Sequence, residues 1–223
     1  MPTLSSAREL EITRDKIAYW FFRLNGFFTF ENFVVHPDEN GSQRTDADII
    51  ALRFLYRQEL RTSDHPMEDY LLFQKQEKYA SVFFVEVKKD ECDLNGPWTK
   101  RDKRNLQRVL NAIGLVPENN VEAASERLYE NYRLNQNNIS IRFAMIGKTP
   151  SSRRDWRDIP QLTWDKILLW MHSRYVDYEH QKANHKQWDS IGDKLYKTAT
   201  QQYKDDPESF KRHWLRQAGI SDC

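Results

Sequence analysis

The sequence predicts an α/β protein in which helices are layered on a mixed β-sheet. Residues 6–25 carry apolar side chains at helical spacing, and a second stretch of this kind lies at residues 98–113. Four runs rich in β-branched and aromatic residues are typical of strands, at residues 27–36, 46–54, 82–88 and 139–146. The predicted order is α-β-β-β-α-β, with a further helix expected at residues 120–133, and this order favours a layered architecture.

The first helix has a readable start and end. Ser6 and Glu9 stand at the S-x-x-E spacing of a capping box, so we expect the helix to begin there. Gly26 is expected to end it, because glycine readily adopts the left-handed conformation that follows a helix. Apolar side chains fall on two nearly opposite stripes, which predicts that the helix is covered on two sides.

The next three elements read as strands. The runs at 27–36 and 46–54 flank a turn-rich segment at 37–42, which predicts a hairpin. Residues 55–80 are mixed and polar, and we interpret them as an insertion or a long excursion. The run at 82–88 is almost continuously apolar, as expected for a central strand buried on both faces.

The chain from residue 151 onward is predicted to be helical. Trp164, Ile167 and Met171 lie on one stripe at helical spacing, and the last helix is expected to start at Asp206-Pro207, a cap residue followed by proline. We therefore expect a core at 1–150, interrupted at about 55–80, and a helical extension at 151–223 packed on it.

Composition limits the classes of function. The 223 residues carry 34 Lys and Arg against 33 Asp and Glu, a formal net charge of +1, so nucleic-acid binding would have to come from local patches. The 2 cysteines provide neither a disulfide framework nor a zinc site by themselves. No signal peptide or apolar run of the roughly 20 residues that span a bilayer is present, so we expect a cytoplasmic protein without membrane contact.

Four charged residues on two predicted strands carry the chemistry. Glu86 and Lys88 are two residues apart and project from one face of their strand, as Asp46 and Asp48 do on theirs. If the strands are neighbours, carboxylates from both meet at one end of the sheet and form an oxygen site suited to Mg²⁺. A lysine beside them can orient a water or stabilise charge on a phosphate. The alternative is an ordinary ion pair at a strand end, which is costly to bury unless it is compensated.

This pattern resembles the motif of a nuclease superfamily. The string Asp48-Ile49-Ile50-Ala51-Leu52 followed by Glu86-Val87-Lys88 is similar to the PD-(D/E)xK motif, with Ala47 in place of the eponymous proline. The helix ending Arg23-Leu24-Asn25-Gly26-Phe27, followed by a hairpin, is similar to archaeal-type Holliday junction resolvases and restriction-endonuclease-like folds. The resemblance covers about residues 6–147, and the separation of 38 residues between the two acids (86 − 48) implies that 55–80 is an insertion.

The resemblance implies a restriction-endonuclease-like core and a set of site residues. Asp48 and Glu86 would bind Mg²⁺ or Mn²⁺ with help from Asp46, and Lys88 would be catalytic. Such families often add an acid from the first helix, for which Glu9, Glu11 and Asp15 are candidates. We favour Asp15 as a metal ligand, because it lies in an apolar stripe and sits near where the resolvase-like pattern carries its helix glutamate, whereas Glu9 is engaged in the capping box.

Basic residues gather on the helix predicted at 98–113. A phosphate-binding surface beside a nuclease site is one interpretation, and a solvated helix face is the other. The candidate nucleic-acid contacts are Lys100, Lys103, Arg104, Arg108 and Gln107. A second basic stretch, Arg153-Arg154-Asp155-Trp156-Arg157, could flank a strand or a base, or could be a surface loop.

The sequence as a whole predicts a metal-dependent nuclease that hydrolyses phosphodiester bonds, with DNA as the expected substrate, in defence, restriction, repair or recombination. The alternative is a catalytically inactive nucleic-acid-binding or scaffold protein that retains the nuclease fold. The helical tail could form a homodimer or bind a protein partner.

Overall fold

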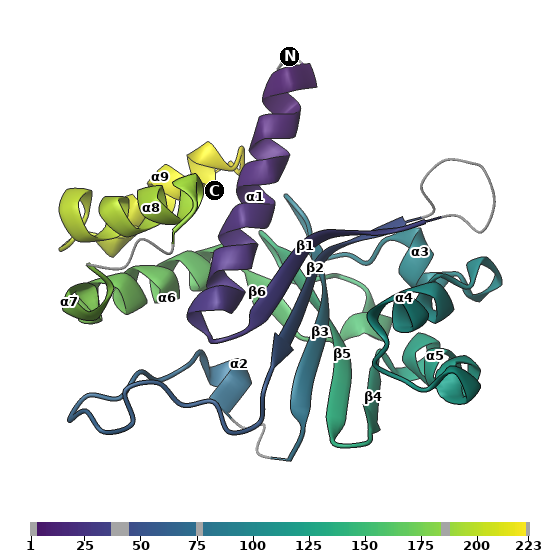
Figure 1. Cartoon of the computed structure of the whole chain (residues 1–223). Coiled ribbons are helices and arrows are strands. Elements are labelled where there is room, and N and C mark those ends of the chain that lie inside the picture. Colours follow the sequence, from purple (N-terminus) through teal and green to yellow (C-terminus); the bar gives the residue numbers. More distant parts are fainter. Residues whose placement is uncertain (1–3, 37–44, 75–77, 184–187, 222–223) are drawn as a thin grey trace.

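A mixed, open sheet of six strands forms the centre of the molecule, with helices on both faces (Figure 1). The structure is a computed structural model that describes residues 4–36, 45–74, 78–183 and 188–221. The strand order is β1-β2-β3-β5-β4, and β6 pairs with β5. Neighbours are antiparallel except for β3 with β5 and β5 with β6, which are parallel. The strands are β1 Phe28–Val35, β2 Thr45–Arg53, β3 Ala80–Val87, β4 Arg133–Gln136, β5 Ile139–Gly147 and β6 Gln161–Thr163. The predicted α/β class with a mixed sheet is therefore confirmed.

One face of the sheet is covered by the first helix together with the helices of the tail. Their apolar side chains and those of the sheet form one hydrophobic cluster, which includes Phe21, Phe83, Trp164 and Phe210. The helices on this side of Figure 1 are α1 Leu4–Leu24, α6 Trp164–Asp177, α7 Glu179–Lys182, α8 Ser190–Lys197, which continues into a π-helical turn at Thr198–Gln202, and α9 Pro207–Gln217.

The opposite face is covered by shorter helices. Phe84, Trp98, Leu110 and Phe143 belong to a second hydrophobic cluster between these helices and the sheet. The helices are α3 Gly96–Thr99, α4 Asn105–Ile113 and α5 Val121–Asn131, with 3₁₀ turns at Arg101–Lys103, Glu118–Asn120 and, before β6, Arg154–Trp156. The sheet therefore separates two cores.

The central strand β3 behaves as predicted. It lies between β2 and β5, and all of its residues after Ala80 are buried. Odd-numbered residues such as Phe83 face the α1 side and even-numbered residues such as Phe84 face the α4 side. A strand covered on both faces needs apolar side chains at every position, which explains the continuous apolar run.

The start of α1 differs from the prediction. The helix begins at Leu4, so Ser6 and Glu9 lie inside it and do not form its cap. The end agrees, because Gly26 follows the last turn with a φ of 75°.

The helix predicted at 98–113 is interrupted. Arg104 has a left-handed φ of 53° and separates the 3₁₀ turn from α4. The apolar spacing of Leu106, Val109 and Leu110 starts only after this break, and these side chains hold only α4 against the sheet. Lys100, Lys103 and Arg104 therefore do not share one face of a continuous helix.

Two strands were not predicted, β4 and β6. The turn between β4 and β5 contains Asn137 and Asn138 with φ of 50° and 61°, and two successive left-handed residues are typical of a tight hairpin. The Asn-Asn pair was the available signal. The four residues of β4 bury only Leu134, which is too short an alternation to recognise.

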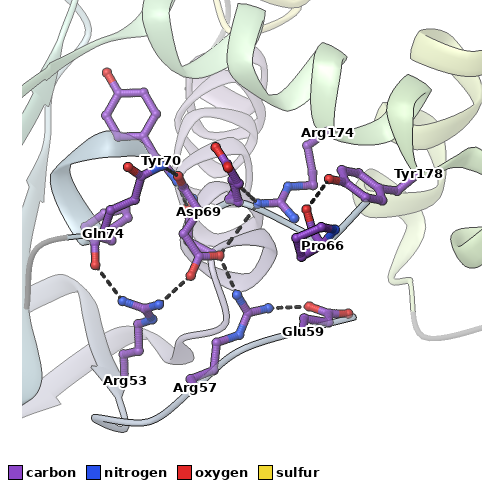
Figure 2. Close-up of polar contacts among 12 residues, drawn as sticks. Arg53, Arg57, Glu59, Pro66, Asp69, Tyr70, Gln74, Arg174 and Tyr178 are labelled. Carbon is purple, nitrogen blue, oxygen red and sulfur yellow. Dashed lines mark hydrogen bonds and ion pairs between the residues drawn. The ribbon is translucent and has the colours of Figure 1, made fainter. Parts of the chain in front are cut away.

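The segment between β2 and β3 is a long irregular excursion, as expected, with one short helix, α2 Leu71–Gln74. It is held by Asp69, whose carboxylate pairs with Arg53, Arg57 and Arg174 (Figure 2). Arg57 also pairs with Glu59, and Arg174 donates to the carbonyl oxygen of Glu68. The excursion is thus tied to the end of β2 and to α6.

From α6 onward the tail is helical, as predicted, whereas Gln161–Thr163 of the tail forms β6 of the sheet. Asp206 accepts a hydrogen bond from the backbone N–H of Ser209 at 2.9 Å and caps α9, which has Pro207 at its first position. Trp164, Ile167 and Met171 lie on α6 and are buried, as their spacing predicts. The division of the chain near residue 150 stays a prediction. No helix within the described ranges is both long and apolar enough to cross a membrane.

Candidate active site

Asp48 and Glu86 are neighbours at one end of the sheet. The register of β2 and β3 pairs Ile49 with Val85, and Asp48 and Glu86 are the next residues along the two strands. The Oδ2 of Asp48 accepts a hydrogen bond from the backbone N–H of Val87 at 2.7 Å. The carboxylate of Asp48 is therefore turned across to the strand that carries Glu86, as the sequence predicts.

The side chain of Glu86 is buried and held from two sides. The residue is 1% exposed, and its Oε2 accepts a hydrogen bond from Trp98 Nε1 at 2.7 Å. Its Oε1 accepts one from Lys88 Nζ at 2.5 Å. Trp98 is itself fixed, because its ring stacks on Phe84 with centroids 6.2 Å apart. Each oxygen of Glu86 thus has a donor, which fixes the orientation of the carboxylate.

Lys88 is positioned through both its backbone and its side chain. Its backbone N–H donates to the carbonyl oxygen of Ile146 at 2.8 Å, and its own carbonyl oxygen accepts from Trp164 Nε1 at 2.9 Å. The ammonium contacts Glu86 and also donates to Asn95 Oδ1 at 2.8 Å. An ammonium has three N–H donors, so one remains for another ligand.

Asp15 is the first-helix acid that the structure brings to this site. It is half-buried on α1, whereas Glu9 and Glu11 are exposed. The pKa of Asp15 is raised to about 7, first by burial and then by the negative charge of Asp48. Of the three candidates, Asp15 is thus the one near Asp48, and its role as a metal ligand stays a prediction.

Asp48 is the shared neighbour of two acids. The pKa of Glu86 is also raised to about 7, by burial and then by Asp48, while Lys88 acts in the opposite direction. Asp15 and Glu86 thus both carry a proton more readily than ordinary carboxyl groups, first because they are buried and then because of the charge of Asp48. Oxygen donors that repel one another in this way fit a hard divalent cation, which would remove the repulsion.

The described part of the structure contains neither the side chain of Asp46, which is the remaining predicted ligand, nor a complete set of metal ligands. Asp46 lies on β2 opposite Val34 of β1, but its side chain lies outside the described part of the structure. Among the described residues, no group of three or more histidine, cysteine, aspartate and glutamate side chains is placed to hold a metal ion. The support for a cation is therefore the chemistry of the Asp15, Asp48 and Glu86 set.

The predicted nucleic-acid residues do not form one surface. Arg104 pairs with Glu122 at 3.1 Å and Lys103 lies 3.6 Å from Asp102, all exposed. Gln107 on α4 is only 6% exposed, so it is buried whereas Lys103 and Arg104 are exposed.

The two remaining candidates, Lys100 and Arg108, lie in different surroundings from Lys103 and Arg104. The guanidinium of Arg108 is turned back to donate to the carbonyl oxygen of Lys103 at 2.5 Å. The exposed Lys100 lies close to the site, because its side chain runs along Gly96, the residue after Asn95.

The second basic stretch does not offer an aromatic ring to a base. Trp156 is fully buried, and Arg153 lies over its ring at 3.9 Å from the centroid. Arg153, Arg154 and Arg157 are exposed cations on a surface segment.

Sequence reasoning missed the residues that hold Glu86 and Lys88. Asn95, Trp98 and Trp164 make these contacts from the loop after β3, from α3 and from α6. The Asn95-Gly96-Pro97-Trp98 string gave a signal for a helix start, because Pro97 is in its first turn. No signal in the sequence pointed to the donor role of the two indole rings.

Comparison of the chain with protein-family models, curated proteins and solved structures found no match.

The raised pKa of Asp15 predicts how stability depends on pH. A carboxyl group whose pKa rises on folding, here from 3.8 to about 7, stabilises the fold below its unfolded pKa, and this contribution is lost as pH rises through about 7. Asp15→Asn should therefore gain stability relative to the parent chain between pH 5 and 8, by on the order of 1–3 kcal/mol. Urea unfolding in EDTA at both pH values measures the difference. Glu9→Gln is the control on the same helix and should show no such change. An equal difference at both pH values for Asp15→Asn would contradict the prediction.

Proposed function

We propose that this chain is a metal-dependent nuclease of the PD-(D/E)xK superfamily with a restriction-endonuclease-like core, acting on DNA. The observation that carries the proposal is the environment of Glu86. This buried acid lies beside Asp48 on the next strand, and Lys88 contacts it at 2.5 Å. Phosphodiester hydrolysis uses such a set, in which carboxylates and a cationic side chain meet at one point.

The residues have distinct roles in this proposal. Asp48 and Glu86, with Asp15, would hold Mg²⁺ or Mn²⁺, which when bound would lower the pKa of a water and stabilise negative charge on a phosphate oxygen. Lys88 offers its remaining N–H to an oxygen of the phosphate or to the attacking water. Trp98 and Lys88 keep Glu86 in one orientation, and Trp164 holds the carbonyl group of Lys88. The protein thus supplies a fixed arrangement of charges.

The second candidate function is a catalytically inactive protein that binds nucleic acid. The direct contact between Lys88 and Glu86 favours it, because a lysine that only neutralises a buried glutamate would make the same contact.

One experiment separates the two functions. Single-stranded, duplex and branched DNA, together with RNA, are incubated with the chain and Mn²⁺ or Mg²⁺, and the thermal midpoint is measured with and without each cation. A nuclease should cleave at least one substrate and gain stability from the cation, and Asp48→Ala should abolish both effects. Asp158→Ala, which changes an exposed acid on the surface, is the matched control. Absence of both cleavage and cation stabilisation in the parent chain would leave only the inactive candidate.

Three of the exposed candidate cations give a separate prediction about salt. Replacing Lys100, Lys103 and Arg104 by Gln should flatten the slope of log K against log salt by up to about 0.7–0.9 for each phosphate contact removed. The thermal midpoint should barely change, because Arg104 loses only an exposed ion pair with Glu122, worth about 0–1 kcal/mol. Filter binding in EDTA at several salt concentrations measures the slope. An unchanged slope would assign these residues to a solvated surface, and Arg153, Arg154 and Arg157 would be tested next.

A further inference from the structure

A cationic pocket lies away from the candidate active site, where α1 ends and β1 begins. Its volume is about 260 Å³, and it is lined on its charged side by Arg23, Arg57, Lys182 and Glu59. Its apolar wall includes Phe28 and Trp188. Arg23 and Asp15 are eight residues apart on α1 (23 − 15), or about 12 Å along the helix axis. The pocket is therefore distinct from the Asp48 site.

Positive charge exceeds negative charge around this pocket. Among the described residues, neither Arg23 nor Lys182 has an ion-pair partner, and Arg57 is shared between Glu59 and Asp69 (Figure 2). Lys182 is partly buried, and its pKa is lowered to about 8, first by burial and further by Arg174 and Arg57, against the opposing charge of Glu59. The surroundings of the Lys182 ammonium are thus short of negative charge.

Neighbouring arginines add to this excess. Arg53 and Arg174 also share the single carboxylate of Asp69, and the Nη1 atom of Arg174 is buried without a hydrogen-bond partner. Arg53 and Arg174 do not line the pocket, but the charge of Arg174 lowers the pKa of Lys182. An anion beside Lys182 would offset part of this positive charge.

A glycine leaves room for Arg57. Gly26 has a φ of 75°, and a Cβ at this position would overlap the guanidinium group of Arg57. The Arg57 side chain therefore lies directly against the backbone of Gly26, where any other residue would displace it. With Glu59 and Asp69 holding its nitrogens, Arg57 presents a preformed cation to the pocket.

The wall of the pocket provides aromatic surface. Phe28 is 54% exposed, and its ring is held edge-on by Phe54 at 5.6 Å between centroids. Trp188 stacks on Tyr196 with an angle of 11° between the rings, which fixes its plane. Arginine and lysine bind phosphate, and aromatic rings of this kind bind the face of a base.

We propose that this pocket binds one nucleotide, with its phosphate at Arg23, Arg57 and Lys182 and its base against Phe28 or Trp188. The nucleotide is either free or the phosphorylated end of a nucleic-acid strand. The volume of about 260 Å³ lies just below the roughly 300–1,000 Å³ of typical small-molecule sites, so it suits a mononucleotide and not a longer ligand. The pocket needs no metal ion, so the proposal stands apart from the nuclease activity.

Calorimetry in EDTA tests the pocket without the candidate metal site. The probes are deoxyadenosine 5′-monophosphate, inorganic phosphate and deoxyadenosine, followed by short DNA oligonucleotides with and without a terminal phosphate. The nucleotide should bind more tightly than phosphate or the nucleoside. Lys182→Gln and Arg23→Gln should each weaken binding by about tenfold or more, since each removes a charge-assisted contact. Lys166→Gln, an exposed lysine of α6, should leave binding unchanged.

The oligonucleotide arm identifies the source of the nucleotide. A phosphorylated oligonucleotide that binds more tightly than the free nucleotide, with loss of affinity when the terminal phosphate is removed, assigns the pocket to a strand end. Binding of the free nucleotide that is equal or tighter assigns it to a free ligand. Failure of both to bind at millimolar concentration, or unchanged affinity in folded Lys182→Gln and Arg23→Gln, overturns the proposal.

Discussion

Lys88→Ala should lower the rate of cleavage by on the order of 10²-fold or more, the usual loss when a positioned proton-transfer or charge-stabilising group is removed. Lys88 is held at its backbone by Ile146 and Trp164 and at its ammonium by Glu86 and Asn95. Its place is therefore independent of substrate. We expect kcat to fall while KM changes little, because the ammonium acts on charge that develops during the reaction.

A purely structural role of Lys88 makes a different prediction. Lys88 opposes the rise in the pKa of Glu86, so its removal raises that pKa further and moves the pH at which Glu86 is charged upward. If neutralising Glu86 were its whole function, raising the pH would restore the activity of Lys88→Ala. We expect activity at pH 9 to stay low. Lys89→Ala removes the exposed lysine next along the chain and is the matched control. Cleavage by Lys88→Ala at the parental rate would show that Lys88 is a strand-end charge only.

The sequence predicted the helices and strands in which burial produces a long, regular pattern of apolar residues. The strand at 82–88 is recognisable because both faces are covered, and α1 because its buried positions recur over many turns. The break at Arg104 was not predictable, because it depends on how α3 and α4 pack, including the hydrogen bond from Asn105 Nδ2 to the carbonyl oxygen of Pro97 at 3.2 Å. An arginine with a left-handed backbone conformation cannot be recognised from the sequence.

The charged residues of the candidate site were predictable from the sequence, but the residues that hold them in place were not. Asp48, Glu86 and Lys88 stand out because charged residues end apolar strands. Trp98 and Trp164 look like ordinary core residues in the sequence, since their donor atoms meet Glu86 and Lys88 only after α3 and α6 pack on the sheet. For the same reason, Asp69 looked like one more acid of a polar excursion.

Asp69→Asn should destabilise the fold by about 3–5 kcal/mol, the range for breaking a buried ion pair from one side. The side chain of Asp69 is 7% exposed, and its partners Arg53 and Arg174 are 12% and 2% exposed, so solvent cannot replace the lost charge. Burial lowers the pKa of both arginines, and Asp69 opposes that shift. Asparagine keeps the shape and removes the charge, which leaves three guanidinium groups close together (Figure 2).

Urea unfolding measures this loss, with Asp64→Asn as the matched control. Asp64 is exposed on the same excursion, and its replacement should stay within about ±0.5 kcal/mol. In the Asp69→Asn background, Arg57→Gln should recover part of the lost stability, because it removes one of the uncompensated charges, although the same change in the parent chain destabilises it. If Arg57→Gln stabilises the Asp69→Asn chain but destabilises the parent chain, uncompensated charge is the cause of the stability lost in Asp69→Asn. Additive losses would instead mean that Asp69 acts only through the shape of its contacts, and the excursion would then be held mainly by the packing of Phe73 and Tyr70 against α1.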